Sequence, residues 1–243
     1  MDWQDQGFIL SAARFGEADA ILDILTENHG RHLGLMKGGS ARTRRADIQT
    51  GNLVSVAWRA RVSEQLGTYT LEIVRPHAAL ALDSPAALAG LSAAAAVAAA
   101  SLPEREPHPN VFAAFGVLLD ALTGGRDAAF GAAVYVKWEA GLLQDLGFGL
   151  DLARCAVTGT VDDLTHVSPR TGRAVSREAA LPYGDRLLRL PPFLLGHQTG
   201  APSAAELADA FRLTGHFLAQ SVLEPHRRPV PPARNHYADL VLR

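Results

Sequence analysis

The sequence contains little cysteine and no apolar run long enough to cross a membrane. Its only cysteine, Cys155, excludes an internal disulfide and fits a reducing compartment. The first ten residues lack the basic, then apolar, then small-residue order of a secretory signal peptide. The most apolar window, residues 85–100, is mostly alanine and is shorter than the roughly 20 residues of a bilayer span. These absences predict a soluble, cytoplasmic protein with a buried helix in this window.

Familiar catalytic motifs are absent as well. The chain has no Gly-x-Ser-x-Gly, no Walker-type phosphate loop and no His-Glu-x-x-His. The adjacent acids Asp162 and Asp163 would suit a metal-dependent nuclease, but neighbouring side chains usually point apart, so a solvated loop is favoured. We interpret Cys155 as a small core residue rather than a nucleophile. The sequence therefore predicts a protein that is not an enzyme.

Basic residues, by contrast, are concentrated in the window of residues 30–61. Seven Lys and Arg against one acid give this window a charge of +6, whereas the whole chain has -2, so the remainder carries -8. A charge run can be an ordinary solvated face, but this asymmetry, and the mixture of Gly and Ser with Arg in residues 38–45, favour binding to a polyanion such as nucleic acid. The predicted DNA-binding residues are Lys37, Arg42, Arg44, Arg45, Arg59 and Arg61.

Short β-strands surround this window. In residues 53–61, Val54, Val56 and Trp58 alternate with Ser55 and Arg59, so one face feeds a core and the other presents charge. Five strands are predicted, at residues 7–13, 18–26, 31–37, 53–61 and 68–73, with a flexible loop at residues 38–45. This strand count favours a small barrel such as the OB-fold, which commonly binds oligonucleotides, although SH3-like barrels share it.

Helical patterns dominate after Pro76. Ser84-Pro85 is a helix start, and Ser203 with Glu206 forms a capping box. Helices are predicted at residues 85–100, 111–122 and 128–146 and after Ser203, followed by a proline-rich tail to Arg243. The sequence therefore predicts a β domain at residues 1–78 and a helical domain at residues 79–243.

An ordered set of short motifs resembles the RecO family of bacterial recombination-mediator DNA repair proteins. The similarity covers nearly the whole chain. Its N-terminal segments are residues 15–19 (FGEAD), 24–26 (ILT), 29–30 (HG), 37–40 (KGGS) and 53–61 (LVSVAWRAR). Its later segments are residues 103–107 (PEREP), 143–148 (LQDLGF, read as Leu-x-x-Leu-Gly-Phe), 155–159 (CAVTG) and 167–172 (VSPRTG).

The resemblance implies an α+β protein with an N-terminal five-stranded OB-fold barrel followed by an all-α helical domain. It implies binding to single- and double-stranded DNA, annealing of complementary strands, and no catalytic turnover or cofactor. It further implies that the protein engages the acidic, apolar C-terminal tail of the single-strand-binding protein. With RecR, family members help RecA replace that protein on single-stranded DNA, so the resemblance places this chain in the cytoplasm with the nucleoid.

The chain departs from the family's zinc pattern. Some relatives carry two Cys-x-x-Cys pairs in the region that begins at Cys155, but here the partner position is Thr158, and residues 173–177 contain no cysteine. A structural zinc site needs about four Cys or His ligands. We therefore predict that residues 151–180 form a degenerate, zinc-less loop or hairpin.

The expected tail of the single-strand-binding protein combines acids with a phenylalanine, so its receptor needs an apolar slot rimmed by Lys or Arg. On the predicted helix at residues 128–146 and just before it, the candidates are Arg126, Lys137 and Trp138. Two other functions stay open at this point. One is an OB-fold RNA-binding module, and the other is a metal-dependent nuclease.

Overall fold

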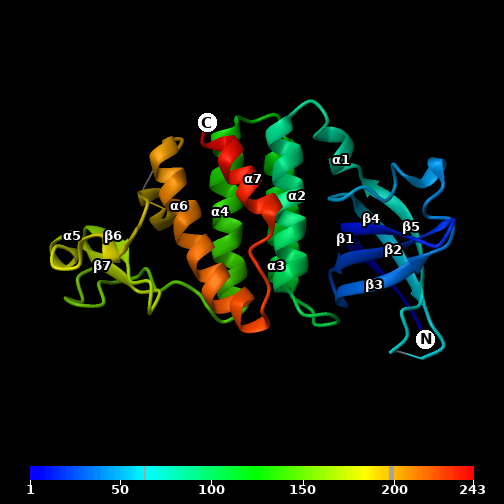
Figure 1. Cartoon of the computed structure of the whole chain (residues 1–243), viewed down its shortest axis with the longest axis horizontal. Helices are drawn as coiled ribbons and strands as arrows, with labels where there is room; N and C mark the ends of the chain where they lie inside the picture. The colour runs from blue at the N-terminus through cyan, green and yellow to red at the C-terminus, as the bar shows by residue number, and fades with distance from the viewer. Residues whose placement is uncertain (63, 197–199) are drawn as a thin grey trace. The chain divides into compact units, whose positions relative to one another are not determined.

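The structure is a computed structural model that describes residues 1–62, 64–196 and 200–243. It contains two compact units (Figure 1). The first comprises residues 1–125 with the short segment 231–234, and the second comprises residues 126–230 with residues 235–243. Within the described ranges, no helix combines the length and the apolar character needed to cross a bilayer.

The first unit starts with a five-stranded sheet, as predicted. Its strands are β1 (Asp2–Phe15), β2 (Asp19–Thr26), β3 (Gly30–Met36), β4 (Leu53–Arg59) and β5 (Thr68–Arg75). The strand order β1-β2-β3-β5-β4 closes on itself, because β1 pairs with both β2 and β4, and β5 meets β3 at the parallel bridge Leu35–Thr68. Helices follow this sheet in the chain, which confirms the α+β arrangement.

Strand β1 begins five residues earlier than the sequence pattern predicts. Residues 2–8 pair with β4, residues 7–15 pair with β2, and an irregularity between Ile9 and Ser11 lets one strand serve both neighbours. The residues before Gly7 alternate polar and charged side chains around Trp3, so they lack the apolar signal that marked the other strands. This extension brings Trp3 and Asp5 into the barrel wall.

The barrel interior is filled by alternate residues of all five strands. Val54, Val56 and Trp58 of β4 are buried while Ser55 and Arg59 are exposed, so the predicted alternation is confirmed. The Nε1–H of Trp58 donates to the Leu66 carbonyl (3.0 Å), which satisfies its one polar atom in the core.

Three helices complete the first unit: α1 (His77–Leu80), α2 (Pro85–Ser101) and α3 (Pro109–Thr123). The Ser84 hydroxyl accepts from the Ala87 N–H at 3.2 Å, which confirms the predicted N-cap of α2. Phe8 of β1 packs against Phe112 and Phe115 of α3, with ring centroids 5.0 and 5.2 Å apart. The barrel and these helices therefore share an apolar interface.

The second unit contains α4 (Ala128–Asp145), α6 (Ala204–Phe217) and most of α7 (Pro232–Val241). Both members of the capping box predicted at Ser203 and Glu206 are in place at the start of α6. Helices α4 and α6 are joined inside the unit by a hydrogen bond of 2.5 Å from the Thr214 hydroxyl to the fully buried Glu139 carboxylate. A π-helix (Leu218–Leu223) continues directly from α6, and a 3-10 helix (Glu224–His226) follows it.

The C-terminal tail is not merely a proline-rich segment, as the sequence pattern predicted, because it contains α7. Pro231 and Pro232 stand at the start of this helix, where their fixed φ is favourable. Tyr237 is 1% exposed, and its ring lies 4.9 Å from that of Tyr135 on α4. Packing of Tyr237 stabilises α7, although the amphipathic pattern of these residues is too weak to predict a helix.

Between α4 and α6 lies a small β module rather than a helical segment. Strands β6 (Leu164–Val167), β7 (Ala174–Ser176) and β8 (Leu188–Arg189) form an antiparallel sheet in the order β7-β6-β8, with the short helix α5 (Arg177–Ala180) after β7. The predicted hairpin is therefore confirmed, and β8 adds a third strand that the sequence did not predict.

Candidate nucleic-acid interface

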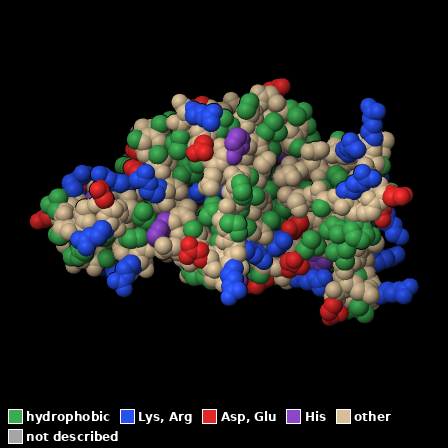
Figure 2. All heavy atoms as spheres, viewed as in Figure 1, with side chains coloured by type: hydrophobic (Ala, Val, Ile, Leu, Met, Phe, Trp, Pro, Cys, Tyr) green, Lys and Arg blue, Asp and Glu red, His purple; other side chains and the backbone are tan. Residues whose placement is uncertain are grey.

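All six predicted DNA-binding side chains are exposed, and we call them the cationic rim: Lys37, Arg42, Arg44, Arg45, Arg59 and Arg61. Lys37 and the 3-10 turn Arg42–Arg44 follow the C-terminal end of β3, and Arg59 and Arg61 lie at the C-terminal end of β4. Leu35 of β3 is bridged to Thr68 of β5, which is paired with Arg59. Because β3 runs parallel and β4 antiparallel to β5, the two groups leave strand ends that point in opposite directions, and Figure 2 shows Lys and Arg side chains along the margin of the barrel unit.

The connection that carries most of the rim is anchored at both of its ends. At the start, the Gly38 N–H donates to the Asp19 carboxylate (2.8 Å) and the Ser40 hydroxyl donates to the Asp19 carbonyl (2.6 Å). At the far end, the buried Asn52 amide donates to the carbonyls of Ala46 and Asp47 at 3.0 and 3.2 Å. The segment predicted as a flexible loop is thus tied to the barrel and presents its arginines from a defined backbone.

Acidic neighbours engage part of the rim only weakly. Arg44 lies 3.3 Å from the carboxylate of Asp47, and Arg59 lies 3.7 Å from that of Asp2, with the latter two side chains 81% and 71% exposed. Such solvent-exposed pairs contribute little free energy, so a phosphate can displace the carboxylate. The rim therefore keeps most of its capacity to bind anions.

Arg31 belongs to the cationic window of the sequence but not to the surface. Its guanidinium lies 2.8 Å from the Asp23 carboxylate and donates to the Leu102 carbonyl at 3.2 Å. The Arg31 and Asp23 side chains are only 13% and 7% exposed. Burial raises the pKa of Asp23, and the hydrogen bond and charge of Arg31 oppose that rise. This arginine holds the barrel to the segment after α2 and is engaged away from any phosphate.

Arg14 lies next to Arg45 of the rim, although the sequence pattern did not single it out. It lines a depression of about 270 Å³ together with Arg45, Glu17 and Ser40. Its guanidinium donates to the carbonyls of Gly16 and Glu17 at 3.2 and 3.0 Å, which holds it beside the β1–β2 turn. Arg14 is isolated in the sequence from the other basic residues, so only the pairing of β1 with β2 brings it close to them.

A second hollow, of about 680 Å³, lies at the other group of rim residues. Arg59 lines it with Thr68 and Thr70 of β5 and with Trp3 and Gln4 of β1. The hollow combines one guanidinium with hydroxyl groups, which proteins use to contact phosphate and sugar.

The predicted partner-tail residues are not brought together as a set. Trp138 is 4% exposed and packs in the core, where its ring lies 5.7 Å from that of Tyr135. Arg126 lies over the Phe130 ring, 4.6 Å from its centroid, at the start of α4. Lys137 is eleven residues further along, which corresponds to about 16 Å of helix.

Lys137 does, however, border an apolar hollow of about 260 Å³. Its ammonium lies 6.0 Å from the centroid of the Phe193 ring, and Leu150, Leu152 and Leu194 line the same hollow. An apolar slot with a cation at its edge can accept an aromatic side chain next to a carboxylate. The sequence pattern around Phe193 does not indicate that this residue contacts α4.

The residues around Cys155 do not fit a zinc ion. In the part of the chain that the structure describes, no cluster of three or more His, Cys, Asp or Glu side chains could hold a metal. Cys155 is buried, and its sulfur accepts from the N–H and the hydroxyl of Ser176 at 3.3 and 3.4 Å. Burial raises the pKa of this thiol, but hydrogen bonds from Ser176 and Thr158 outweigh it and lower the pKa to about 6. Hydroxyl groups thus contact the sulfur, and the donor set is one that zinc disfavours.

The acidic pair that suggested a nuclease is also separated. Asp163 lies 3.0 Å from the guanidinium of Arg177, and Asp162 precedes it in the turn before β6. The ion pair closes the base of the β6–β7 hairpin, where the Arg177 N–H also donates to the Asp163 carbonyl at 3.0 Å. Asp163 is therefore a structural residue of the small β module.

Known proteins match this chain over its full length. The model for the N-terminal part of recombination protein O matches residues 1–77, and the model for its C-terminal part matches residues 82–229. A DNA repair protein RecO from Phenylobacterium zucineum is 54% identical over 234 residues, which cover 96% of this chain and 95% of the relative. Proteins of the same name from Rhodospirillum centenum and Rhizobium etli are 48% and 45% identical, over 98% and 100% of this chain and 94% and 93% of theirs.

Proposed function

Because the chain belongs to the RecO family, we propose that it is a DNA repair and recombination mediator that binds single- and double-stranded DNA through the cationic rim. One observation carries this proposal. The six rim side chains are exposed on and next to the strands of a five-stranded barrel, in a protein whose remaining charge is negative. Nucleic acid is the polyanion that such a surface attracts.

The rim acts on phosphate rather than on base sequence. Each Lys or Arg that neutralises a phosphate releases a condensed counterion, so binding is driven by the entropy of released ions and weakens as salt rises. Guanidinium groups on an anchored backbone fix the position of the sugar-phosphate chain without reading its sequence. Two complementary strands held on the same cationic surface repel each other less, and this promotes their annealing.

A salt series tests DNA binding directly. The affinity of the full chain for fluorescein-labelled oligo(dT) and for a duplex is measured by anisotropy between roughly 50 and 200 mM salt. We expect both affinities to fall steeply and to depend little on sequence. An equal preference for single-stranded RNA would favour the RNA-binding module, and a flat salt response would contradict the electrostatic mechanism.

We propose further that the second unit recruits the single-strand-binding protein. The hollow beside Lys137 suits the tail of that protein, because Phe193 and three leucines offer an apolar floor and the ammonium offers a partner for a carboxylate. With RecR, the protein then helps to load RecA onto DNA that the single-strand-binding protein covers. Arg126 and Trp138 support α4 in this scheme, and Lys137 makes the direct contact.

Changing Lys137 to glutamate is expected to weaken binding of an acidic peptide that ends in phenylalanine by about tenfold or more. The change replaces attraction by repulsion at the edge of the apolar hollow. Tryptophan fluorescence or anisotropy of a labelled peptide measures the affinity. The matched control is Lys37→Glu, which changes the charge equally in the first unit and leaves peptide binding intact. Equal peptide affinity in Lys137→Glu and wild type would remove Lys137 from the site.

A further inference from the structure

We propose that His29 is a stacking platform for one unpaired base and gives the barrel its preference for single-stranded DNA. The proposal rests on the proposed DNA binding and names the part of the strand that this second contact recognises. It does not involve the cationic rim, which contacts phosphate in either kind of DNA.

Three aromatic rings form a column across the barrel wall. The rings of Trp3 and Trp58 are stacked, with centroids 5.6 Å apart and planes inclined by 17°. The His29 ring is stacked on Trp3 at 4.2 Å and 9°. Because β1 lies between β4 and β2 in the sheet, Trp3 lies between Trp58 of β4 and His29 of the β2–β3 turn. His29 is thus the last ring of the column.

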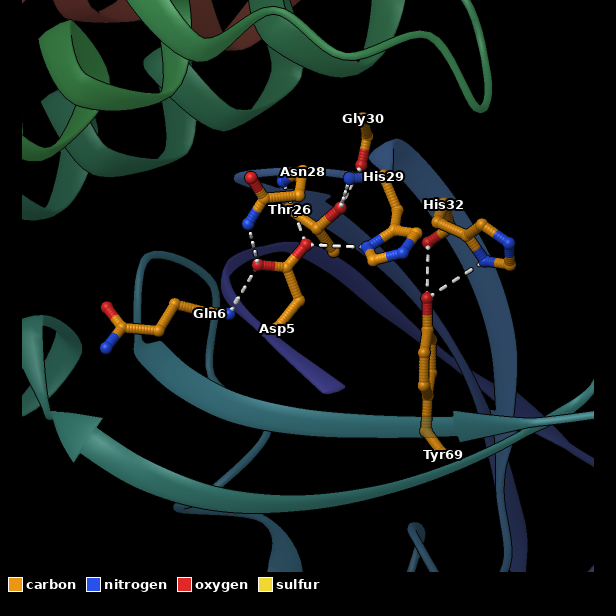
Figure 3. A network of polar contacts seen from close by, with 8 residues as sticks. All are labelled: Asp5, Gln6, Thr26, Asn28, His29, Gly30, His32 and Tyr69. Carbon is orange, nitrogen blue, oxygen red and sulfur yellow. Dashed lines mark hydrogen bonds and ion pairs between the residues drawn. The ribbon is translucent and has the colours of Figure 1, made fainter. Parts of the chain in front are cut away.

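The orientation of the His29 ring is fixed by Asp5 (Figure 3). The Asp5 carboxylate is 1% exposed, and it accepts from His29 Nδ1 at 2.8 Å and from the N–H and side-chain amide of Asn28 at 2.8 and 3.0 Å. Burial raises the pKa of Asp5, but the hydrogen bonds from His29, Asn28 and Gln6 outweigh it and lower the pKa. An ionised Asp5 requires a proton on Nδ1, so the ring is held flat against Trp3 with its other edge outward.

The turn that carries His29 is equally well defined. The Thr26 hydroxyl donates to the Gly30 carbonyl at 2.7 Å and accepts from the His29 N–H at 3.2 Å. Gly30 adopts a φ of 69°, and a Cβ there would run into the backbone of Glu106. The platform therefore needs little ordering when a ligand arrives.

Part of the His29 side chain is accessible to a ligand. The side chain is 35% exposed although Trp3 covers one of its faces. A buried carboxylate below and an indole beside the ring make a preorganised flat surface of the kind on which bases stack. A histidine that served only to close the turn would not need this alignment with two tryptophans.

The column and the Arg59 side chain lie on opposite faces of the β1–β4 pair, because Trp58 and Trp3 pack on the barrel core and Arg59 is exposed. The platform is therefore a contact separate from the phosphate contact that Arg59 makes. In a duplex both faces of each base are covered by neighbouring bases, so only a single strand can use the platform.

The test compares single-stranded, double-stranded and base-free ligands at one salt concentration. His29→Ala is expected to weaken binding of oligo(dT) by about 5- to 100-fold, which is the range for removal of one base-stacking side chain. Its affinity for a duplex and for an oligomer of abasic sites is expected to stay within about twofold of wild type. His29→Phe keeps a flat ring on Trp3 and removes the bond to Asp5, and it is expected to restore oligo(dT) binding. His226→Ala, at an exposed histidine of the second unit, is the matched control.

The outcomes separate this proposal from the one on which it rests. Wild-type protein that binds none of the three ligands overturns DNA binding itself. If the wild-type protein binds DNA and His29→Ala weakens binding of single strand, duplex and abasic oligomer equally, His29 has a structural role. That result overturns the platform alone. If alanine loosens the turn, His29→Phe still decides, since failure to restore oligo(dT) binding in a folded variant also overturns it.

Discussion

Replacing both Arg42 and Arg45 with alanine is expected to weaken binding of single-stranded and duplex DNA about tenfold or more at low salt. Neither arginine depends on a strong ion pair for its position, because the surrounding connection is held by Asp19 and Asn52. Both side chains are exposed and extend from the end of β3. Their removal should therefore abolish phosphate binding at these two positions without loosening the barrel.

The salt dependence gives the more specific result. The slope of the logarithm of affinity against the logarithm of salt is expected to fall by about 2, because two phosphates are no longer neutralised. The control is Arg227→Ala with Arg228→Ala, which removes the same charge from an exposed segment of the second unit. An unchanged slope in the rim variant, or an equal change in the control, would show that overall charge rather than the rim determines binding.

Acid is expected to destabilise the first unit through His77. This imidazole is 1% exposed, lies 3.3 Å from the Thr123 hydroxyl and faces Asp120 at 3.7 Å. Desolvation lowers the pKa of His77 to about 4. The charge of Asp120 raises this pKa, and the charge of Arg75 lowers it further. Above pH ~6.5 the histidine is neutral in both states. Between about 6.5 and 4 only the unfolded chain binds the proton, so the free energy of unfolding falls by about 3 kcal/mol in total.

Urea unfolding of the full chain between roughly pH 7 and 4 measures this effect. His77→Asn keeps a polar group near Thr123 and should show a shallower fall in the free energy of unfolding over that range. His226→Ala, which removes an exposed imidazole, should retain the wild-type slope. A variant at position 77 with the full wild-type pH dependence would mean that other groups, such as the paired carboxylates, are responsible for the fall.

The strands that the sequence predicted well are those with clear alternation. The strand predicted at residues 53–61 is observed at Leu53–Arg59 with the predicted facing, because Val54, Val56 and Trp58 give the period of two of a half-buried strand. The alternation rule did not predict the strand at residues 2–6. These residues are in a strand because β1 closes the barrel by pairing with both β2 and β4. Trp3 was therefore left outside the predicted fold, and the column that ends at His29 could not be foreseen.

The sequence predicted the total charge of the basic window but not which of its side chains are exposed at the surface. Arg31 and Arg45 look alike in the sequence, yet Arg31 is bound to Asp23, eight residues earlier, and Arg45 is exposed. Pairing of β2 with β3 decides this difference, since it places Leu33 opposite Asp23 and brings the Arg31 side chain alongside. Arg14 shows the converse case, because tertiary pairing adds it to a basic group from which it is distant in the sequence.

The partner-tail residues show a limit of helical spacing. Lys137 and Trp138 are neighbours in sequence, but adjacent residues of a helix point about 100° apart, so one lies at the edge of a hollow and the other in the core. The sequence could identify Lys137, which borders the hollow. It could not identify Phe193, which comes from a segment more than 50 residues away.

A cationic rim that brings complementary DNA strands together should be visible in the kinetics of duplex formation. The quantity to measure is the rate at which complementary oligonucleotides, each coated with single-strand-binding protein, form a duplex in the presence of this chain. We predict that the wild-type chain accelerates pairing, that added salt suppresses the acceleration, and that Arg42→Ala with Arg45→Ala largely abolishes it. Acceleration that is equal in wild type and in this variant, or no acceleration at any salt concentration, would contradict a role of the rim in strand pairing.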